Sequence, residues 1–143
     1  MWQRIQTLYL AVSTILLGSM FFSSVARIVT PDGGVEKIMY SEISEYMIFI
    51  TAVFIANCLC LFAFKFRNIQ MRLCIINAIV LLAFQIWLGV DYFRNMKDMT
   101  YSFTAVFPVI SAILNVLAAR NIFLDEVLVQ TSSRLRSSRR KSR

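Results

Sequence analysis

Histidine is missing from this chain of 143 residues, and glycine and proline are scarce, with four and two copies. Without histidine the chain cannot form a Ser/His/Asp triad or a Cys/His pair, which are common machinery of nucleophilic catalysis. The sequence also contains no glycine-rich loop of the kind that cradles a phosphate group. We therefore expect no enzymatic activity.

Charged residues are scarce as well, at 16%, whereas hydrophobic residues make up 58% and the mean hydropathy is +0.65. This composition is typical of integral membrane proteins and not of a soluble domain. Because no acid or base lies within the longest apolar stretches, they offer neither a proton relay nor a charged ion site, which transporters usually need. These uncharged stretches are Ile5 to Ala26, Tyr46 to Phe64, Leu73 to Val90 and Tyr101 to Ala119.

The three cysteines, Cys58, Cys60 and Cys74, lie within or at the edge of these stretches. No fourth cysteine and no histidine is present to complete a structural metal site. We expect the cysteines to act as small apolar packing residues, and we predict neither a metal nor another cofactor.

The uncharged stretches predict an all-α integral membrane fold with four transmembrane helices. The shortest, Leu73 to Val90, spans about 27 Å as a helix, which suffices for a slightly thinned bilayer core. The connections Lys65 to Arg72 and Asp91 to Thr100 are short, so successive helices should pack as antiparallel neighbours in a bundle. Pro108 lies in the middle of the fourth stretch and predicts a kink there.

Lysine and arginine are distributed unevenly between the two sides of such a bundle. Arg4, the Lys65 to Arg72 loop and the segment from Arg120 onward hold eleven of the fifteen basic residues. The positive-inside rule therefore predicts a multi-pass membrane protein with both termini in the cytoplasm. Trp2 is expected at the inner interface, and five aromatic anchors are expected at the outer one: Tyr40, Tyr46, Trp87, Tyr92 and Tyr101.

The outer connection from Arg27 to Glu45 contains a turn signature, Pro31-Asp32-Gly33-Gly34, between two segments rich in β-branched residues. This pattern predicts a short β-hairpin, although a lone hairpin is only marginally stable. Ser41 or Ser44 is placed to cap the helix that follows.

Three asparagines, Asn57, Asn77 and Asn115, lie inside the uncharged stretches. We expect them to make polar contacts between helices inside the bundle, with Asn77 and Asn115 within hydrogen-bonding reach. A transporter would instead line a polar cavity with these residues and Gln85. Small residues at helical spacing should mark the other contact faces: Thr7, Ala11, Thr14 and Gly18; Ala52 and Ala56; Ser111, Asn115 and Ala119.

The chain ends in a strongly basic segment. We divide the sequence into a membrane domain of residues 1–129, whose fourth helix extends two or three turns into the cytoplasm, and a basic cytoplasmic tail of residues 130–143. The tail holds five Arg, one Lys, five Ser and no acid. Its basic residues are candidate ligands of RNA phosphates or lipid head groups: Arg134, Arg136, Arg139, Arg140, Lys141 and Arg143.

Three interpretations of this tail remain open. A run of like charges is most often a solvated, disordered segment, which here would fix the topology. Alternatively, the tail binds anionic lipid. It could also bind RNA, because arginine forks match phosphate groups, although no aromatic residue interleaves the run to read bases. Asp125 and Glu126, just upstream, are expected to pair with Arg120 or with the tail.

Both ends of the chain carry motifs that resemble a known family. They are Trp2-Gln3-Arg4-Ile5-Gln6-Thr7-Leu8-Tyr9-Leu10 at the start, and Ala118-Ala119-Arg120, Asp125-Glu126-x-Leu128-Val129 (where x is any residue) and Ser133-Arg134-Leu135-Arg136 at the end. With its four spans, the chain resembles a family of small four-helix inner-membrane proteins of Bacteroidota, a domain of unknown function. The resemblance covers nearly the whole chain and implies location and topology, but no chemistry. The segment Ser137 to Arg143 looks more variable in that family.

These features predict a non-catalytic accessory subunit packed beside other protein subunits of an inner-membrane complex, with no small-molecule substrate. Its tail would dock on an anionic cytoplasmic surface. Ribosomal RNA at a protein-export translocon is the first such surface we consider, because an export channel gathers membrane helices and ribosomal RNA in one place. Two alternatives are a small homo-oligomeric transporter or channel and a free-standing membrane protein that binds anionic lipid.

Overall fold

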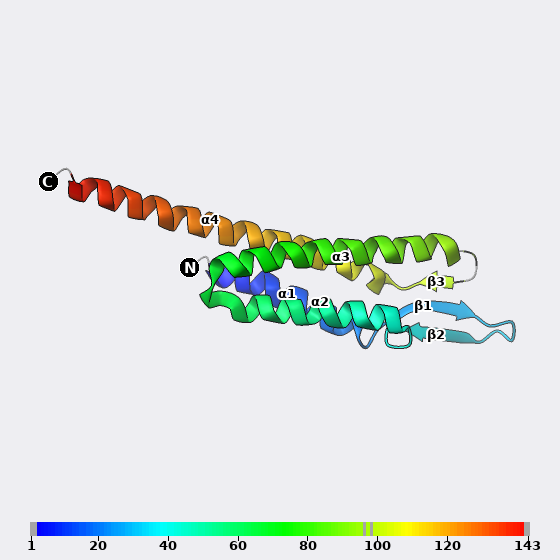
Figure 1. Cartoon of the computed structure of the whole chain (residues 1–143). Coiled ribbons are helices and arrows are strands. Elements are labelled where there is room, and N and C mark those ends of the chain that lie inside the picture. The colour runs from blue at the N-terminus through cyan, green and yellow to red at the C-terminus, as the bar shows by residue number, and fades with distance from the viewer. Residues whose placement is uncertain (1–2, 96, 98, 142–143) are drawn as a thin grey trace.

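A computed structural model describes residues 3–95, 97 and 99–141 of the chain, the side chains of residues 3, 4, 64 and 138–141 excepted. Four helices lie side by side, with a small sheet at one end of the bundle, while the last helix projects from the other end (Figure 1). We call these ends the sheet end and the tail end. In chain order the elements are α1 (Gln3–Met20), β1 (Ser24–Val29), β2 (Val35–Met39), α2 (Ser44–Phe62), the 3-10 helix η1 (Ala63–Lys65), α3 (Arg67–Asn95), β3 (Met99–Tyr101), the 3-10 helix η2 (Phe103–Val106) and α4 (Phe107–Lys141).

Three segments of the described chain are long and apolar enough to cross a membrane: Ser44–Phe62, Arg67–Asn95 and Phe103–Ser137. The apolar helix Ile5–Met20 is shorter than these. The start of α1 and the end of α4 both lie toward the tail end (Figure 1). These helices indicate a membrane protein.

Each helix buries a stripe of residues at alternating steps of three and four, the spacing of left-handed helix bundles. In α1 the stripe is Gln6, Leu10, Ser13, Leu17 and Met20, and in α2 it is Tyr46, Ile50, Val53, Asn57 and Cys60. The small-residue faces predicted for these two helices are therefore wrong in part, since Ala52 is exposed and Thr7 is too. The predicted face of α4, in contrast, is buried at Ser111, Asn115 and Ala119.

Two predicted spans have a boundary that differs from that of the helix that forms. The first was expected to reach Ala26, but α1 ends at Met20 and, after a short turn, β1 begins at Ser24. The fourth was expected to begin at Tyr101, but α4 begins at Phe107. Pro108 is consequently the second residue of α4, where its missing N–H leaves no helical hydrogen bond unmade, so the predicted mid-span kink is wrong.

The sheet has the strand order β2-β1-β3 and is antiparallel throughout. The predicted hairpin is confirmed as β1 and β2, and Gly33 in its turn adopts a φ of 78°, which favours glycine. The third strand, β3, pairs with the other edge of β1, with Ala26 opposite Tyr101. The predicted serine cap of α2 is wrong, because Ile43 occupies the N-cap position and makes no side-chain cap bond.

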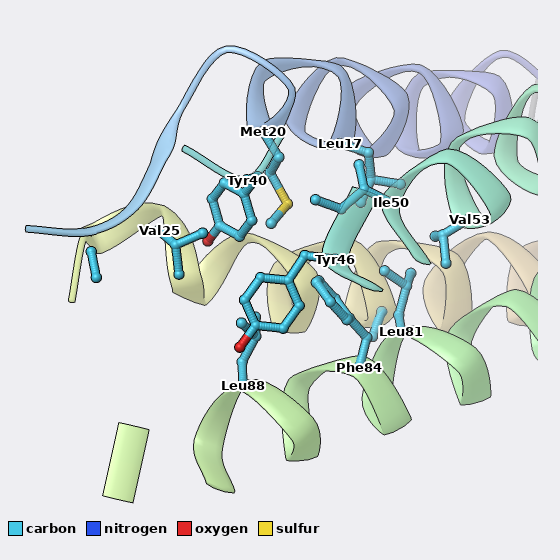
Figure 2. Packing of buried hydrophobic residues seen from close by; sticks show 12 residues of the cluster. Leu17, Met20, Val25, Tyr40, Tyr46, Ile50, Val53, Leu81, Phe84 and Leu88 are labelled. Carbon is cyan, nitrogen blue, oxygen red and sulfur yellow. The ribbon is translucent and has the colours of Figure 1, made fainter. Parts of the chain in front are cut away.

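Apolar and aromatic residues fill the space between the sheet and the helices. Figure 2 shows Met20 and Leu17 of α1 facing Tyr40 and Ile50, with Phe84 and Leu88 of α3 on the opposite side. Of the expected aromatic anchors, Tyr40 and Tyr46 are almost fully buried in this cluster. Burial raises the pKa of the Tyr40 phenol above its ordinary value. Trp2, the expected inner anchor, lies outside the described residues.

The hydroxyl of Tyr46 in α2 donates a hydrogen bond to the carboxylate of Asp91 in α3. We expect Tyr46→Phe to lower the free energy of unfolding by about 1.5 kcal/mol, because a hydrogen bond to a charged group is lost. Unfolding of the purified protein in detergent measures this change. Tyr92→Phe is the matched control, because Tyr92 is 38% exposed, and its effect should stay within about 0.5 kcal/mol. Equal effects of the two variants would contradict the prediction.

Candidate functional site

A ring of hydrogen bonds in the bundle interior joins one polar residue from each helix: Ser13 of α1, Asn57 of α2, Asn77 of α3 and Asn115 of α4. All four side chains are at most 2% exposed. The structure thus brings together the three asparagines that the sequence singled out. Such a buried network fixes the relative heights and rotations of all four helices at once.

The hydrogen bonds connect each ring residue to the next, from Ser13 through Asn57, Asn77 and Asn115 and back to Ser13. Asn57 donates to the Ser13 hydroxyl at 2.7 Å, and Asn77 donates to Oδ1 of Asn57 at 3.0 Å and of Asn115 at 3.5 Å. Asn115 closes the ring by donating to the same Ser13 oxygen at 3.1 Å, and it also donates to the carbonyl of Ser111 at 2.9 Å. Oδ1 of Asn77 and Oγ of Ser111 are buried without a hydrogen-bond partner.

The ring contains amide and hydroxyl groups but no titratable group, so it provides no acid, base or nucleophile activated by a neighbouring base. Gln85, which a polar cavity was expected to include, lies elsewhere, in a groove near the sheet end with Tyr92 and Tyr101. The ring residue that sequence reasoning missed is Ser13. The signal that could have found it is the spacing of larger residues around it, with Leu10 three positions before and Leu17 four positions after. This buried stripe lies one position before the predicted small-residue stripe.

Two of the three cysteines pack among apolar residues toward the tail end, whereas Cys58 is partly exposed. Cys60 and Cys74 are fully buried in a cluster with Leu10, Ala118 and Ile122. The amide of Gln70 donates to the carbonyl of Cys60 at 3.0 Å. Across the part of the chain that the structure describes, no group of three His, Cys, Asp or Glu side chains is placed to hold a metal ion.

Two acids hold α4 against the bundle where it leaves the other helices. Asp125 accepts a hydrogen bond from Gln6 of α1 at 2.9 Å. The side-chain amide of Asn68 in α3 lies beside Glu126, and with its nitrogen toward the carboxylate it donates at 2.8 Å. Glu126 also accepts from Gln130 at 3.5 Å. The expected partners of these acids were Arg120 or the tail. The contacts described join them to Gln6 of α1, to Asn68 of α3 and to Gln130, the first residue of the tail.

Beyond Glu126, α4 continues as a helix to Lys141 and projects past the start of α3 (Figure 1). This segment, which we call the α4 extension (residues 127–141), is about 22 Å long. Its side chains from Val127 to Ser137 are all exposed, including Arg134 and Arg136. The helix therefore continues beyond Ala119 for more than the two or three turns expected, and it includes most of the segment assigned to the tail. The side chains of Arg139, Arg140 and Lys141 lie outside the described residues, and so does Arg143.

The comparisons with known proteins identify a family. A model described as a domain of unknown function, DUF4293, matches residues 2–135. The chain belongs to this family. The search of curated proteins gave no match to the chain. The match includes the whole hydrogen-bonded ring and the start of the α4 extension, whereas the residues from Arg136 onward lie beyond it.

Proposed function

We propose that this protein is a non-catalytic accessory subunit of a larger complex in a bacterial inner membrane. Four membrane crossings, with both termini in the cytoplasm, place the α4 extension over the cytoplasmic surface. There it docks on a polyanion, for which ribosomal RNA at a protein-export translocon is the first candidate. The single observation that carries this proposal is the unbroken helix that leads from the buried ring to a basic, exposed end.

The charge of the α4 extension supports a polyanionic partner. From Val127 onward the sequence has six basic residues and no acid, so its attraction to phosphate is not offset locally. Arg134 and Arg136, the arginines of the α4 extension whose side chains the structure describes, are exposed to solvent. Guanidinium groups hold phosphate oxygens in a bidentate manner, which suits an RNA backbone and requires no base-specific contact.

The anchoring of α4 supports a positioning role. The ring fixes α4 within the membrane, and Asp125 and Glu126 fix it to α1 and α3 where it emerges. A rigid helix with three such attachments presents its basic end at a defined distance from the membrane. A flexible tether would not do so, because its end would sample many distances.

A second candidate is a homo-oligomeric transporter, and the ring does not favour it. Such a protein needs polar groups that line an open path, whereas the three asparagines bond to one another and to Ser13. A free-standing protein that binds anionic lipid through its tail is the third candidate. Its tail would respond to vesicle charge and not to RNA.

Affinity purification from native membranes at low and at high salt tests the proposal. We expect the full-length protein to retain ribosomal or translocon components at about 50 mM salt and to release most ribosomal components by about 200 mM, because phosphate contacts weaken steeply with salt. Membrane-protein partners held through the helices should remain at both concentrations. Recovery of neither class of partner would refute the accessory-subunit proposal.

A further inference from the structure

A cavity at the tail end lies between the junction of η1 with α3 and the root of the α4 extension. Its volume is about 470 Å³, within the range of small-ligand sites. Lys65 and Arg67 line it on one side, and Val129 and Gln130 of α4 line it on the other. None of these residues belongs to the hydrogen-bonded ring, so the cavity is a separate feature of the fold.

The walls of the cavity combine cations with exposed apolar side chains. Phe66 lies between Lys65 and Arg67 in the sequence and is 61% exposed, and Ile69 follows them and is 53% exposed. Val129, on the α4 side of the cavity, is 57% exposed. The uncharged stretch of α3 begins only a few residues later, at Leu73. In a membrane this arrangement lies at the boundary between head groups and acyl chains, where basic residues reach the head groups and apolar residues face the chains.

The charges of the cavity favour an anion. The lining includes two cations, Lys65 and Arg67, and a single carboxylate, that of Glu126, so it has a net positive charge. Glu126 already accepts hydrogen bonds from the amides of Asn68 and Gln130, which weakens its attraction for the two cations. An ammonium and a guanidinium that flank an apolar residue are the groups expected to hold a phosphate whose substituents are hydrophobic.

We propose that this cavity binds the phosphate head group of an anionic glycerophospholipid. Lys65 and Arg67 contact the phosphate, and the acyl chains run along Phe66, Ile69 and Val129 toward the membrane interior. Because Val129 and Gln130 belong to the root of the α4 extension, a bound lipid also braces that helix against α3. This site is distinct from the basic end of α4 and does not depend on the partner proposed for it.

Native mass spectrometry of the purified full chain in detergent, titrated with phosphatidylglycerol, tests this site. The double variant Lys65→Gln/Arg67→Gln should weaken lipid retention about 20- to 30-fold, because each basic residue near a head group contributes about fivefold. The matched control Arg27→Gln/Lys37→Gln removes the same charge from two exposed residues at the sheet end and should retain lipid as the unmodified protein does. Equal retention by the two double variants would overturn the proposal.

Two further measurements test whether the effect is due to misfolding and whether the ligand is a lipid. Glu126→Gln removes the opposing carboxylate and should raise retention of phosphatidylglycerol about two- to threefold, which a misfolded variant would not do; unchanged or lower retention would count against the site. Glycerol phosphate is added as a competitor to distinguish a lipid from a soluble phosphate. We expect it to displace little lipid at millimolar concentration, because it lacks the acyl chains. Full displacement would show that the ligand is a soluble phosphate and would overturn the lipid assignment.

Discussion

Replacing Arg134, Arg136, Arg139 and Arg140 with glutamine should remove most of the affinity of the purified protein for RNA. Six phosphate contacts give a slope of log affinity against log salt of about −4 to −5, and each lost contact reduces its magnitude by about 0.7 to 0.9. The fourfold variant should therefore have a slope of about −1 to −2. For the unmodified protein, affinity should fall about 300- to 1,000-fold between 50 and 200 mM salt. Fluorescence anisotropy with a labelled single-stranded RNA measures both quantities.

The matched control changes four basic residues at the opposite end of the bundle, Arg27, Lys37, Arg94 and Lys97, to glutamine. It alters the net charge by the same amount, so non-specific attraction falls equally in the two variants. We expect the control to keep nearly the full salt slope. If the control loses as much affinity as the fourfold arginine variant, RNA binds through net charge alone and the α4 extension has no special role. If RNA does not bind the unmodified protein, the RNA proposal fails.

The second large effect concerns the hydrogen-bonded ring. Asn57→Ala removes the bond to Ser13 and the shorter of the two bonds from Asn77, and it leaves a cavity at a position that is 0% exposed. Interhelical hydrogen bonds in membranes contribute about 0.6 to 2 kcal/mol each, and the unpaired groups left behind add to the cost. We expect the free energy of unfolding in detergent to fall by about 3 kcal/mol.

Ser19→Ala is the control for this experiment. The hydroxyl of Ser19 donates to the carbonyl of Leu16 in its own helix and joins no other helix. Its loss should cost about 0.5 kcal/mol or less. A double-mutant cycle with Asn77→Ala should then show a coupling of about 1 kcal/mol between Asn57 and Asn77. Additive effects would mean that the ring does not act as a unit.

The helices of this protein could be predicted because uncharged runs of sufficient length have few alternatives in a membrane. The ends of the helices were harder to predict from the sequence. Hydropathy does not distinguish an apolar helix from an apolar strand, so the first stretch was extended to Ala26 although β1 begins at Ser24. Pairing decides between the two: Ser24 of β1 lies opposite Met39 of β2, and Ala26 also lies opposite Tyr101 of β3, a strand that follows α3 in the chain. No local pattern in the sequence reports that contact.

The polar residues of the ring were easier to find than its geometry. An asparagine in an apolar stretch needs a partner wherever it lies, so Asn57, Asn77 and Asn115 were evident. Serine carries a weaker signal, because its hydroxyl can bond to its own helix, as Ser19 does. Ser13 could be distinguished only by the stripe of larger residues around it, such as Leu10 and Leu17. The cavity beside Lys65 had no sequence signal, since it depends on how α4 passes α3.

The strand order has a consequence for the biogenesis of the protein. β1 is the middle strand of the sheet, yet β3, its partner on one side, is synthesised only after α2 and α3. Until α2, α3 and β3 have been synthesised, the edge of β1 that pairs with β3 has no partner strand. Docking of β3 is thus a closing step that joins the early half of the polypeptide to the late half. A chain stalled before that step would display an open strand edge, which proteases or chaperones could recognise as a sign of incomplete folding.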